Sequence, residues 1–331
     1  MPRITDINRI LFPVEEHPVF AHIQTAQGEK RIRVPERKAI ANAATGIVLG
    51  VVSQDYRLVT NNEALSLGKR CCQQLFEEVK DKEWTVFKVD APSTASFCHI
   101  DLIHKTFVLN FFDSSIRQEV YVPYVRVTNS YNALRALRFD VGFCRKLCSN
   151  GVVFEAETIS FRYSHTRDSL SAEINFEIRK GKLKKLQEDF GNYITALRQF
   201  PLPDADALLL LKATAGIPDK ADLELPPGSK LEAERDGLES HLAGLVARYR
   251  DDLGANAFAF FNALTDFASN PPANRFVRKD INAMQRAAGA WLREFSGKSQ
   301  TPGFAVETYL EDLKKEKEAD AKRPPERSHA E

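Results

Sequence analysis

The first part of the chain consists of short apolar runs separated by turn residues, a pattern typical of strands. The runs are rich in aromatic and β-branched side chains, and Gly, Asn, Asp and Ser separate them. The pattern predicts a hairpin at 22–34 with its turn near Gln27 and Gly28, a strand–turn–strand unit at 45–59, a β-rich region at 84–128, strands at 132–142 and 152–163, and one helical turn at 143–149.

Helical spacing of apolar residues begins at 60–80, where Asn61 or Asn62 is expected to cap the helix and Cys72 to face the core with Cys71 at its flank. It returns at 179–200 and dominates the rest of the chain. Strands first and helices later indicate an α+β protein, a twisted antiparallel sheet with packed helices followed by a helical C-terminal region. The expected divisions are a sheet domain at 1–200, a helical region at 201–318 and a disordered tail at 319–331.

The composition of this 331-residue chain limits the class of protein and the cellular location that we expect. Hydrophobic residues make up 43% and charged residues 27%, which is ordinary for a globular protein. The sequence contains no run of about 18 apolar residues, so it predicts no membrane span. The polar segment Met1–Phe12 does not resemble a signal peptide, and five cysteines suit no disulfide framework. We therefore expect a cytoplasmic protein without membrane partners.

Charge is unevenly distributed along the chain. Residues 1–200 hold 28 Lys and Arg against 23 Asp and Glu, a net charge of +5. Residues 201–331 hold 18 against 22, a net charge of −4. This difference favours the first part as the location of any nucleic-acid contact.

The clearest candidate for metal chemistry is the pair Cys144 and Cys148. A tetrahedral site needs two further ligands, and the sequence offers no second cysteine pair with suitable spacing. Cys144 is therefore interpreted as core, and we expect no metal and no other cofactor. Catalytic motifs are also missing from the sequence, and His99 and His104 would face opposite sides of a strand. The pattern therefore favours a protein that is not an enzyme.

Basic residues interleaved with aromatic ones give the stronger signal. Cations on a sheet can bind phosphates while rings stack on bases, as in platforms for single-stranded nucleic acid. The alternative is a solvated sheet face opposite an aromatic core. A second basic patch opens the predicted helix at 179–200. The candidate nucleic-acid-binding residues are Arg126, Arg135, Arg138, Arg145, Lys146, Arg162, Lys182, Lys184 and Lys185.

Four segments carry a family resemblance, in the order GVVSQDYRLVTNNEAL (50–65), VPYVRVTNSYNALRALRFDVGFCRKLCSNGVVF (122–154), YSHT (163–166) and FFNALTDFAS (260–269). Together they make the chain, over about residues 45–295, similar to the phage/plasmid-like protein family, which is defined by a domain of unknown function numbered nine-three-two. The family pattern includes Asn129, Ser130 and Tyr131, then Ala133-Leu134-Arg135. Leu58 departs from it, since proline is usual there, and so does Ser164, where arginine is common. The resemblance implies carriage on phages, plasmids or integrated elements, and no established activity.

We therefore expect a nucleic-acid-binding accessory protein of a mobile genetic element, with single-strand binding or annealing in recombination or replication as its activity and single-stranded DNA as the favoured partner. Two alternatives stay open. One is an enzyme that acts on nucleic acid or nucleotides through Asp101, Glu155 or His165. The other is an assembly or inhibitor subunit of a defence or counter-defence system, with the helical segment 229–318 as its interface. A homo-oligomer is a separate expectation for the protein.

Overall fold

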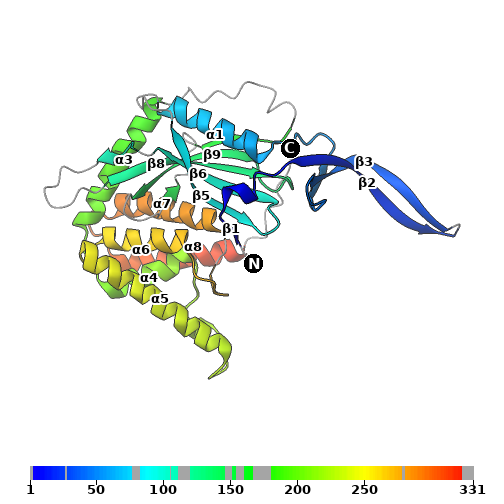
Figure 1. Cartoon of the computed structure of the whole chain (residues 1–331). Coiled ribbons are helices and arrows are strands. Elements are labelled where there is room, and N and C mark those ends of the chain that lie inside the picture. Colours follow the sequence, from blue (N-terminus) through cyan, green and yellow to red (C-terminus); the bar gives the residue numbers. More distant parts are fainter. Residues whose placement is uncertain are drawn as a thin grey trace. The chain divides into compact units, whose positions relative to one another are not determined.

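The computed structural model describes residues 3–26, 28–76, 83–104, 106–110, 120–145, 151–153, 160–166, 180–277 and 280–322. The chain forms two compact units. Unit 1 comprises Met1–Leu109, Tyr121–Phe143 and Ala156–Lys184, and unit 2 comprises Asn110–Val120, Cys144–Glu155 and Lys185–Glu331. Strands dominate the first part of the chain and helices the last (Figure 1), so the structure confirms the predicted α+β class.

The main sheet of unit 1 follows the order β1-β5-β6-β8-β9, with β11 paired to β9 and β7 paired to β8. Pairing is antiparallel between β1 and β5, between β5 and β6, between β6 and β8, and between β9 and β11. The β-rich interpretation of 84–128 is confirmed. The strands are β1 (Arg3–Ile4), β5 (Trp84–Pro92), β6 (Phe97–His104), β7 (Leu109–Asn110), β8 (Val120–Ser130), β9 (Leu137–Arg145) and β11 (Ser160–Tyr163).

Helix α1 (Asn61–Leu75) covers one face of this sheet. Its cap is Thr60, one residue before the expected Asn61 or Asn62, because Thr60 and Glu63 form a reciprocal capping box. Gly68 lies directly against Val127 on the sheet. Both Cys71 and Cys72 are fully buried, so the flank position expected for Cys71 is wrong.

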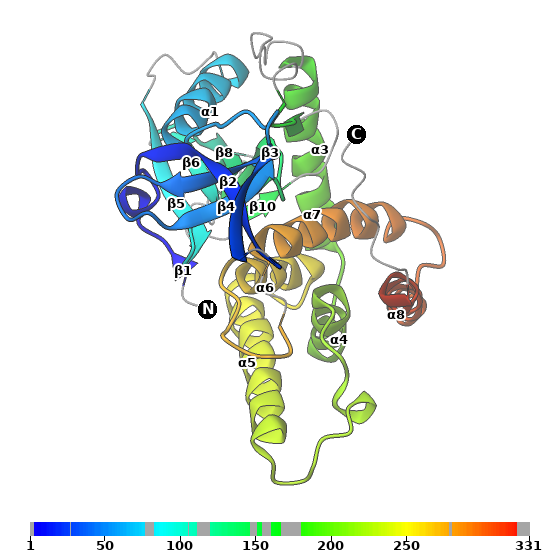
Figure 2. The same ribbon diagram turned by 90° about the vertical axis from the view of Figure 1, so that its right-hand side faces the viewer.

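A second sheet, β2-β3-β4, contains an arm that projects from unit 1 (Figures 1 and 2). The arm is the ribbon of β2 (Val14–Thr25) and β3 (Gly28–Asn42), which pair antiparallel from Val14 opposite Asn42 to Thr25 opposite Gly28. The predicted hairpin is thus confirmed, and it is far longer than 22–34. Strand β4 (Val48–Ser53) pairs with the base of β3.

The expected strand–turn–strand unit at 45–59 is a single strand, β4, followed by an isolated bridge at Tyr56. Gly50 does not make a turn. A Cβ at Gly50 would lie 2.6 Å from Asn132 Cα and 2.7 Å from the Tyr131 carbonyl oxygen, so the glycine is needed for close packing. Local sequence cannot distinguish this use of glycine from a turn.

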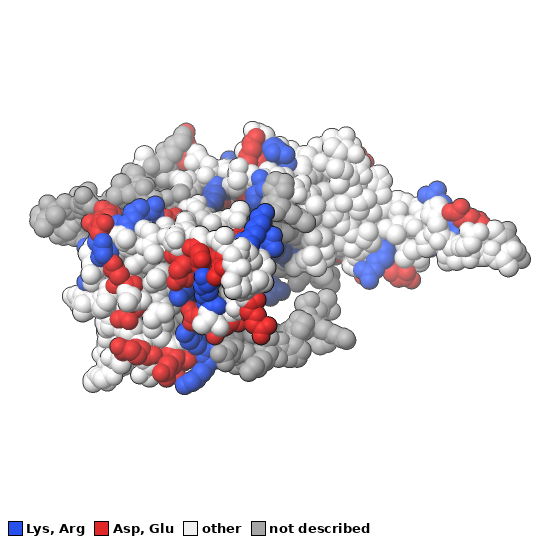
Figure 3. Space-filling view, turned by 90° about the horizontal axis from the view of Figure 1, so that it is seen from below, with Lys and Arg blue, Asp and Glu red and all other residues white. Residues whose placement is uncertain are grey.

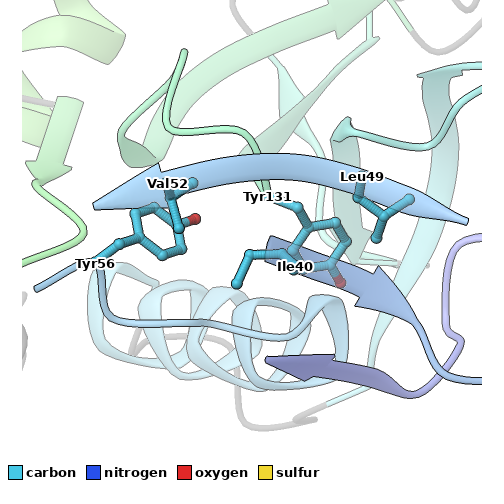
Figure 4. Packing of buried hydrophobic residues seen from close by; sticks show 5 residues of the cluster. All are labelled: Ile40, Leu49, Val52, Tyr56 and Tyr131. Atoms are coloured by element: carbon cyan, nitrogen blue, oxygen red, sulfur yellow. The ribbon is translucent and has the colours of Figure 1, made fainter. Parts of the chain in front are cut away.

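A small apolar cluster fixes the base of the arm to the main sheet (Figure 4). Tyr56 donates a hydrogen bond from its hydroxyl to the Ser130 carbonyl oxygen at the end of β8. The cluster consists of Ile40, Leu49, Val52, Tyr56 and Tyr131, all nearly inaccessible to solvent.

Strand β9 differs from its prediction at both ends. It begins at Leu137 because residues 131–136 form a turn, in which Ala133 adopts φ 58°. It also includes Phe143 and Cys144, where a helical turn was expected, and Cys144 is buried. The rest of that segment, 146–150, lies outside the described residues, as does Cys148. The strand expected at 152–163 is described only as β10 (Gly151–Val153) and β11.

Unit 2 is built from helices, and β10 also belongs to it. Nearly every residue of helix α6 is buried, which is expected of a helix with apolar residues on all sides, although Asn262, Thr265 and Ser269 are among its buried residues. Helix α8 reaches Lys322, four residues into the segment 319–331 expected to be a disordered tail. No helix among the described residues is long and apolar enough to cross a membrane. The helices are α3 (Lys180–Gln199, which begins in unit 1), α4 (Asp204–Ala215), α5 (Lys230–Leu253), α6 (Ala257–Ser269), α7 (Ile281–Lys298) and α8 (Val306–Lys322).

Candidate nucleic-acid interface

The face of the main sheet turned away from α1 carries polar residues on successive strands. Leu102 and Val127 face α1, so their neighbours Asp101 and Arg126 point to the other side. The strand register places Asp101 directly opposite Arg126, and His99 opposite Thr128. Cations and carboxylates therefore meet across the strands of this face.

Arg126 and Asp101 form a buried bidentate ion pair. Nε and Nη2 of Arg126 donate to the two carboxylate oxygens at 2.6 and 2.7 Å, and the side chains are 3% and 7% exposed. Burial alone would lower the pKa of Arg126, but the charge of Asp101, with Tyr124 and Asp140, raises it above its usual value. The guanidinium is charged, neutralised inside the sheet and out of reach of a surface ligand.

Arg138 lies at the rim of the same polar group. Its Nη2 donates to Asp140 Oδ1 at 3.2 Å and to Ser160 Oγ at 3.1 Å, and Ser160 also donates to Asp140. Asp140 is fully buried, whereas the Arg138 side chain is 22% exposed. Arg138 thus has one edge in an internal network and another toward solvent.

Arg162 on β11 stands directly opposite Arg138 on β9. Residues paired in this way point to the same face, and like charges in that position destabilise a sheet. Arg162 is exposed and makes no ion pair with any residue that the structure describes. Asp140 balances the charge of Arg138, so the pair keeps one positive charge, on Arg162, that a bound anion would balance.

The turn at 131–136 adjoins this pair, since it leads into β9 just before Arg138. In this turn the Leu134 side chain is 80% exposed, and the preceding Ala133 adopts the left-handed φ of 58°. Asn132 Oδ1 accepts a hydrogen bond from the Leu134 amide at 3.2 Å. Arg135 places its guanidinium carbon 4.4 Å from the centre of the Phe97 ring.

Sequence reasoning missed Leu134 as a functional candidate because 132–142 was interpreted as one strand, in which a leucine is expected to be buried. The only available signal was its position in the Ala133-Leu134-Arg135 pattern.

The remaining sequence-predicted residues fall into two groups. Lys184 and Lys185 are exposed in the first turns of α3 and form a separate basic patch. Arg145 ends β9 and Lys182 lies in α3, but their side chains, and the whole of Lys146, lie outside the described part of the chain. The structure therefore sets Arg138 and Arg162 opposite each other, places Arg135 over Phe97 at the same end of the sheet, and buries Arg126 in the interior.

The residues of the enzyme alternative do not assemble a reactive site in the described part of the chain. Asp101 is held by Arg126, and Glu155 lies outside the described residues. His165 stacks on Tyr56 with ring centres 4.8 Å apart, and its Nδ1 lies 3.2 Å from the Arg57 carbonyl oxygen. Burial lowers the pKa of His165, an effect that this hydrogen bond opposes. No group of three or more His, Cys, Asp or Glu side chains there could hold a metal.

Three of the sequence motifs meet in a buried hydrogen-bond network rather than at a surface. Asn129 donates to Asn61 Oδ1 at 2.8 Å and to the Val59 carbonyl oxygen at 2.9 Å. The backbone N–H of Asn61 donates a hydrogen bond to the Tyr131 hydroxyl at 3.0 Å. His165 joins through its stacking on Tyr56. These motif residues link α1, β8 and the base of the arm, so they specify the fold.

The fold and this network define the class, an α+β protein in which three of the four motifs meet in the interior of unit 1. A family model described as Domain of unknown function (DUF932) matches residues 48–291, and the chain belongs to that family. Comparison with curated proteins gave no match, and neither did comparison with solved structures.

Proposed function

We propose that the protein is a nucleic-acid-binding accessory protein of a mobile genetic element that holds single strands during recombination or replication. The observation that carries the proposal is the pair of arginines, Arg138 and Arg162, set opposite each other on one face of the sheet. Asp140 already balances the charge of Arg138, so a phosphate group would supply the negative charge that balances Arg162. Unit 1 supports this location, because it holds 23 Lys and Arg against 18 Asp and Glu, whereas unit 2 holds 23 against 27.

Leu134 and Arg135 give a reason to prefer single strands. An exposed apolar side chain gains contact area from the face of an unpaired base, which a duplex hides within its stack. Arg135, held on the Phe97 ring, would then lie beside the backbone of the same strand. In the proposed interface Arg135, Arg138 and Arg162 bind phosphates, and Leu134 contacts a base.

The test is a titration of labelled single-stranded DNA, single-stranded RNA and duplex DNA by fluorescence anisotropy at several salt concentrations. Arg162→Ala and Arg135→Ala should each weaken binding and reduce the slope of log affinity against log salt by about 0.7, the value of one phosphate contact on a single strand. Arg275→Ala is the matched control, because Arg275 lies in unit 2 with its side chain 64% exposed. The substitution removes the same charge as Arg162→Ala and Arg135→Ala. Unchanged slopes in both test variants, or no binding at low salt, would refute the proposal.

The base contact is tested separately with Leu134→Ser. Burying a leucine contributes about 1.5 kcal/mol or more, so the variant should bind single strands about tenfold more weakly at every salt concentration. Leu209→Ser removes another exposed leucine, 37% accessible and located in unit 2, and should have no effect. Equal losses for single-stranded and duplex DNA would contradict the role of Leu134 in strand preference.

A further inference from the structure

The arm of β2 and β3 is exposed on both of its faces. No described residue between positions 15 and 37 is buried. A two-stranded ribbon is at best marginally stable in water unless a face of it packs against something. This ribbon nevertheless pairs along the full 12 residues of β2. Packing of one of its faces against a partner would therefore stabilise the arm.

The two faces of the arm differ in chemistry. One face is polar, and on it Arg31 lies over the Phe20 ring at 3.8 Å and His22 Nδ1 lies 2.8 Å from Glu29 Oε1. The other face is aliphatic, with Ile23 44% and Ile32 39% exposed. The alternation of β2 and its register with β3 define this aliphatic face as Val19, Ala21, Ile23, Ile32 and Val34.

The aliphatic face continues onto the base of the arm. There His17 pairs with Ala39, and Ala39 pairs with Val51 of β4, which is 52% exposed. The opposite side at this level is already covered, because Ile40 and Val52 enter the apolar cluster. On the side visible in Figure 3, most of the arm's surface is uncharged. The result is an aliphatic surface that is open to solvent and has His17, Glu15 and Lys30 along it, and apolar surface of this kind on a globular protein marks an interaction site.

We propose that this aliphatic face binds the same face of a second copy of the chain, with the two arms antiparallel about a two-fold axis near Val19. Charge supports this arrangement. Lys30 stands opposite Ile23 near the tip of the arm, and Glu15 stands at its base on the same face. Val19 lies midway between the levels of Glu15 and Ile23, so the axis brings each Lys30 to the partner's Glu15. The two levels are about 26 Å apart at about 3.3 Å per residue.

Other arrangements fit the arm less well. Addition of a strand at the β2 edge would need backbone donors, and Pro18, in the middle of that edge, has no N–H. A polyanion would bind the polar face, where Arg31 and Arg33 lie, rather than the aliphatic one. A two-fold contact between identical aliphatic faces meets neither obstacle.

The experiment measures the molar mass of the full chain by sedimentation equilibrium, without nucleic acid, over roughly 1 to 100 μM. The wild-type chain should be dimeric in this range. The double variant Ile23→Asp/Ile32→Asp should dissociate at least about 100-fold more readily, since four central side chains are lost from each dimer. Gln24→Asp, on the polar face beside Ile23, is the matched control and should stay dimeric. All substituted positions are exposed, so we expect the variants to fold as the wild type does. Thermal unfolding of each variant checks this.

Charge exchange tests the antiparallel register. Lys30→Glu and Glu15→Lys should each weaken the dimer, and the double variant Lys30→Glu/Glu15→Lys should recover the wild-type affinity. A monomeric wild-type chain at the highest concentration, or a dimer that survives Ile23→Asp/Ile32→Asp, would overturn the proposal. Failure of the charge-exchanged double variant to recover would overturn the two-fold register. None of these outcomes depends on nucleic-acid binding.

Discussion

Gly68 in α1 provides a sharp test of how tightly helix and sheet are packed. A methyl group added there would lie 2.3 Å from Val127 Cγ2 and 2.9 Å from Leu102 Cδ1. Carbon atoms in contact are ordinarily about 3.5–4.0 Å apart, so α1 or Val127 must move by more than about 1 Å. Val127 is on β8, an inner strand of the sheet, which limits its freedom to move.

Two effects of opposite sign determine the result of Gly68→Ala. Alanine is favoured over glycine in a helix interior by about 1 kcal/mol. Overpacking of a filled core costs about 1–3 kcal/mol, and an overlap this severe belongs at the upper end. We therefore expect Gly68→Ala to lower the free energy of unfolding of unit 1 by about 1–2 kcal/mol.

The matched control is Gly244→Ala in α5, an exposed helical glycine with no other group within 4 Å of its added methyl. Only the helix preference acts there, so the control should stabilise unit 2 by up to about 1 kcal/mol. Urea unfolding followed by tryptophan fluorescence separates the units, because the two tryptophans are Trp84 in unit 1 and Trp291 in unit 2. Trp291→Phe and Trp84→Phe backgrounds report each unit alone. If Gly68→Ala stabilises unit 1 as the control stabilises unit 2, the packing argument is refuted.

Three further outcomes are expected. Asp101→Asn should destabilise the fold by about 3–5 kcal/mol in urea unfolding, because Arg126 would be left buried without a countercharge; a loss below 1 kcal/mol would contradict this. Burial lowers the pKa of His165, so its contribution to stability is complete above about pH 6.5, the unfolded value, and is lost as pH falls through the folded pKa. His165→Gln should therefore flatten the dependence of stability on pH between about 7 and 5, and an unchanged slope would count against it. Burial also raises the pKa of the thiols of Cys71, Cys72 and Cys98, so a thiol reagent should label them only after unfolding. Mass spectrometry measures this labelling, and rapid labelling of the native protein at these cysteines would disprove the expectation.

Helix α1 was predictable because it buries residues at helical spacing, among them Ala64, Gly68 and Leu75. Strands β5, β6 and β8 were predictable as a β-rich region because they are rich in aromatic and β-branched residues, although β8 is buried at every position from 121 to 130 and shows no alternation in burial. The start of β9 was not predictable in this way, because it depends on the left-handed turn at Ala133. The prediction of a turn at Gly50 was wrong for a related reason, since the role of this glycine is set by contact with a segment about 80 residues later in the chain.

The candidate interface was predicted in part. Arginines among aromatic residues on strands indicated where cations would gather, and the structure places Arg135, Arg138 and Arg162 at one end of the sheet. The burial of Arg126 could not be inferred, because its partner Asp101 is 25 positions away and becomes its neighbour only through strand pairing. Exposure of Leu134 likewise depends on where β8 ends and β9 begins.

The arm has a consequence for how such proteins diverge. The family match begins at Val48, the first residue of β4, so the whole β2–β3 ribbon precedes it. Within the apolar cluster, the ribbon contributes only Ile40 as a fully buried member, while the other four residues lie inside the matched region. Evolution can therefore lengthen, replace or remove the ribbon while the matched region keeps its interior. A chain that matches the family model but has no such ribbon would also have no aliphatic face of the kind proposed above as a dimer contact.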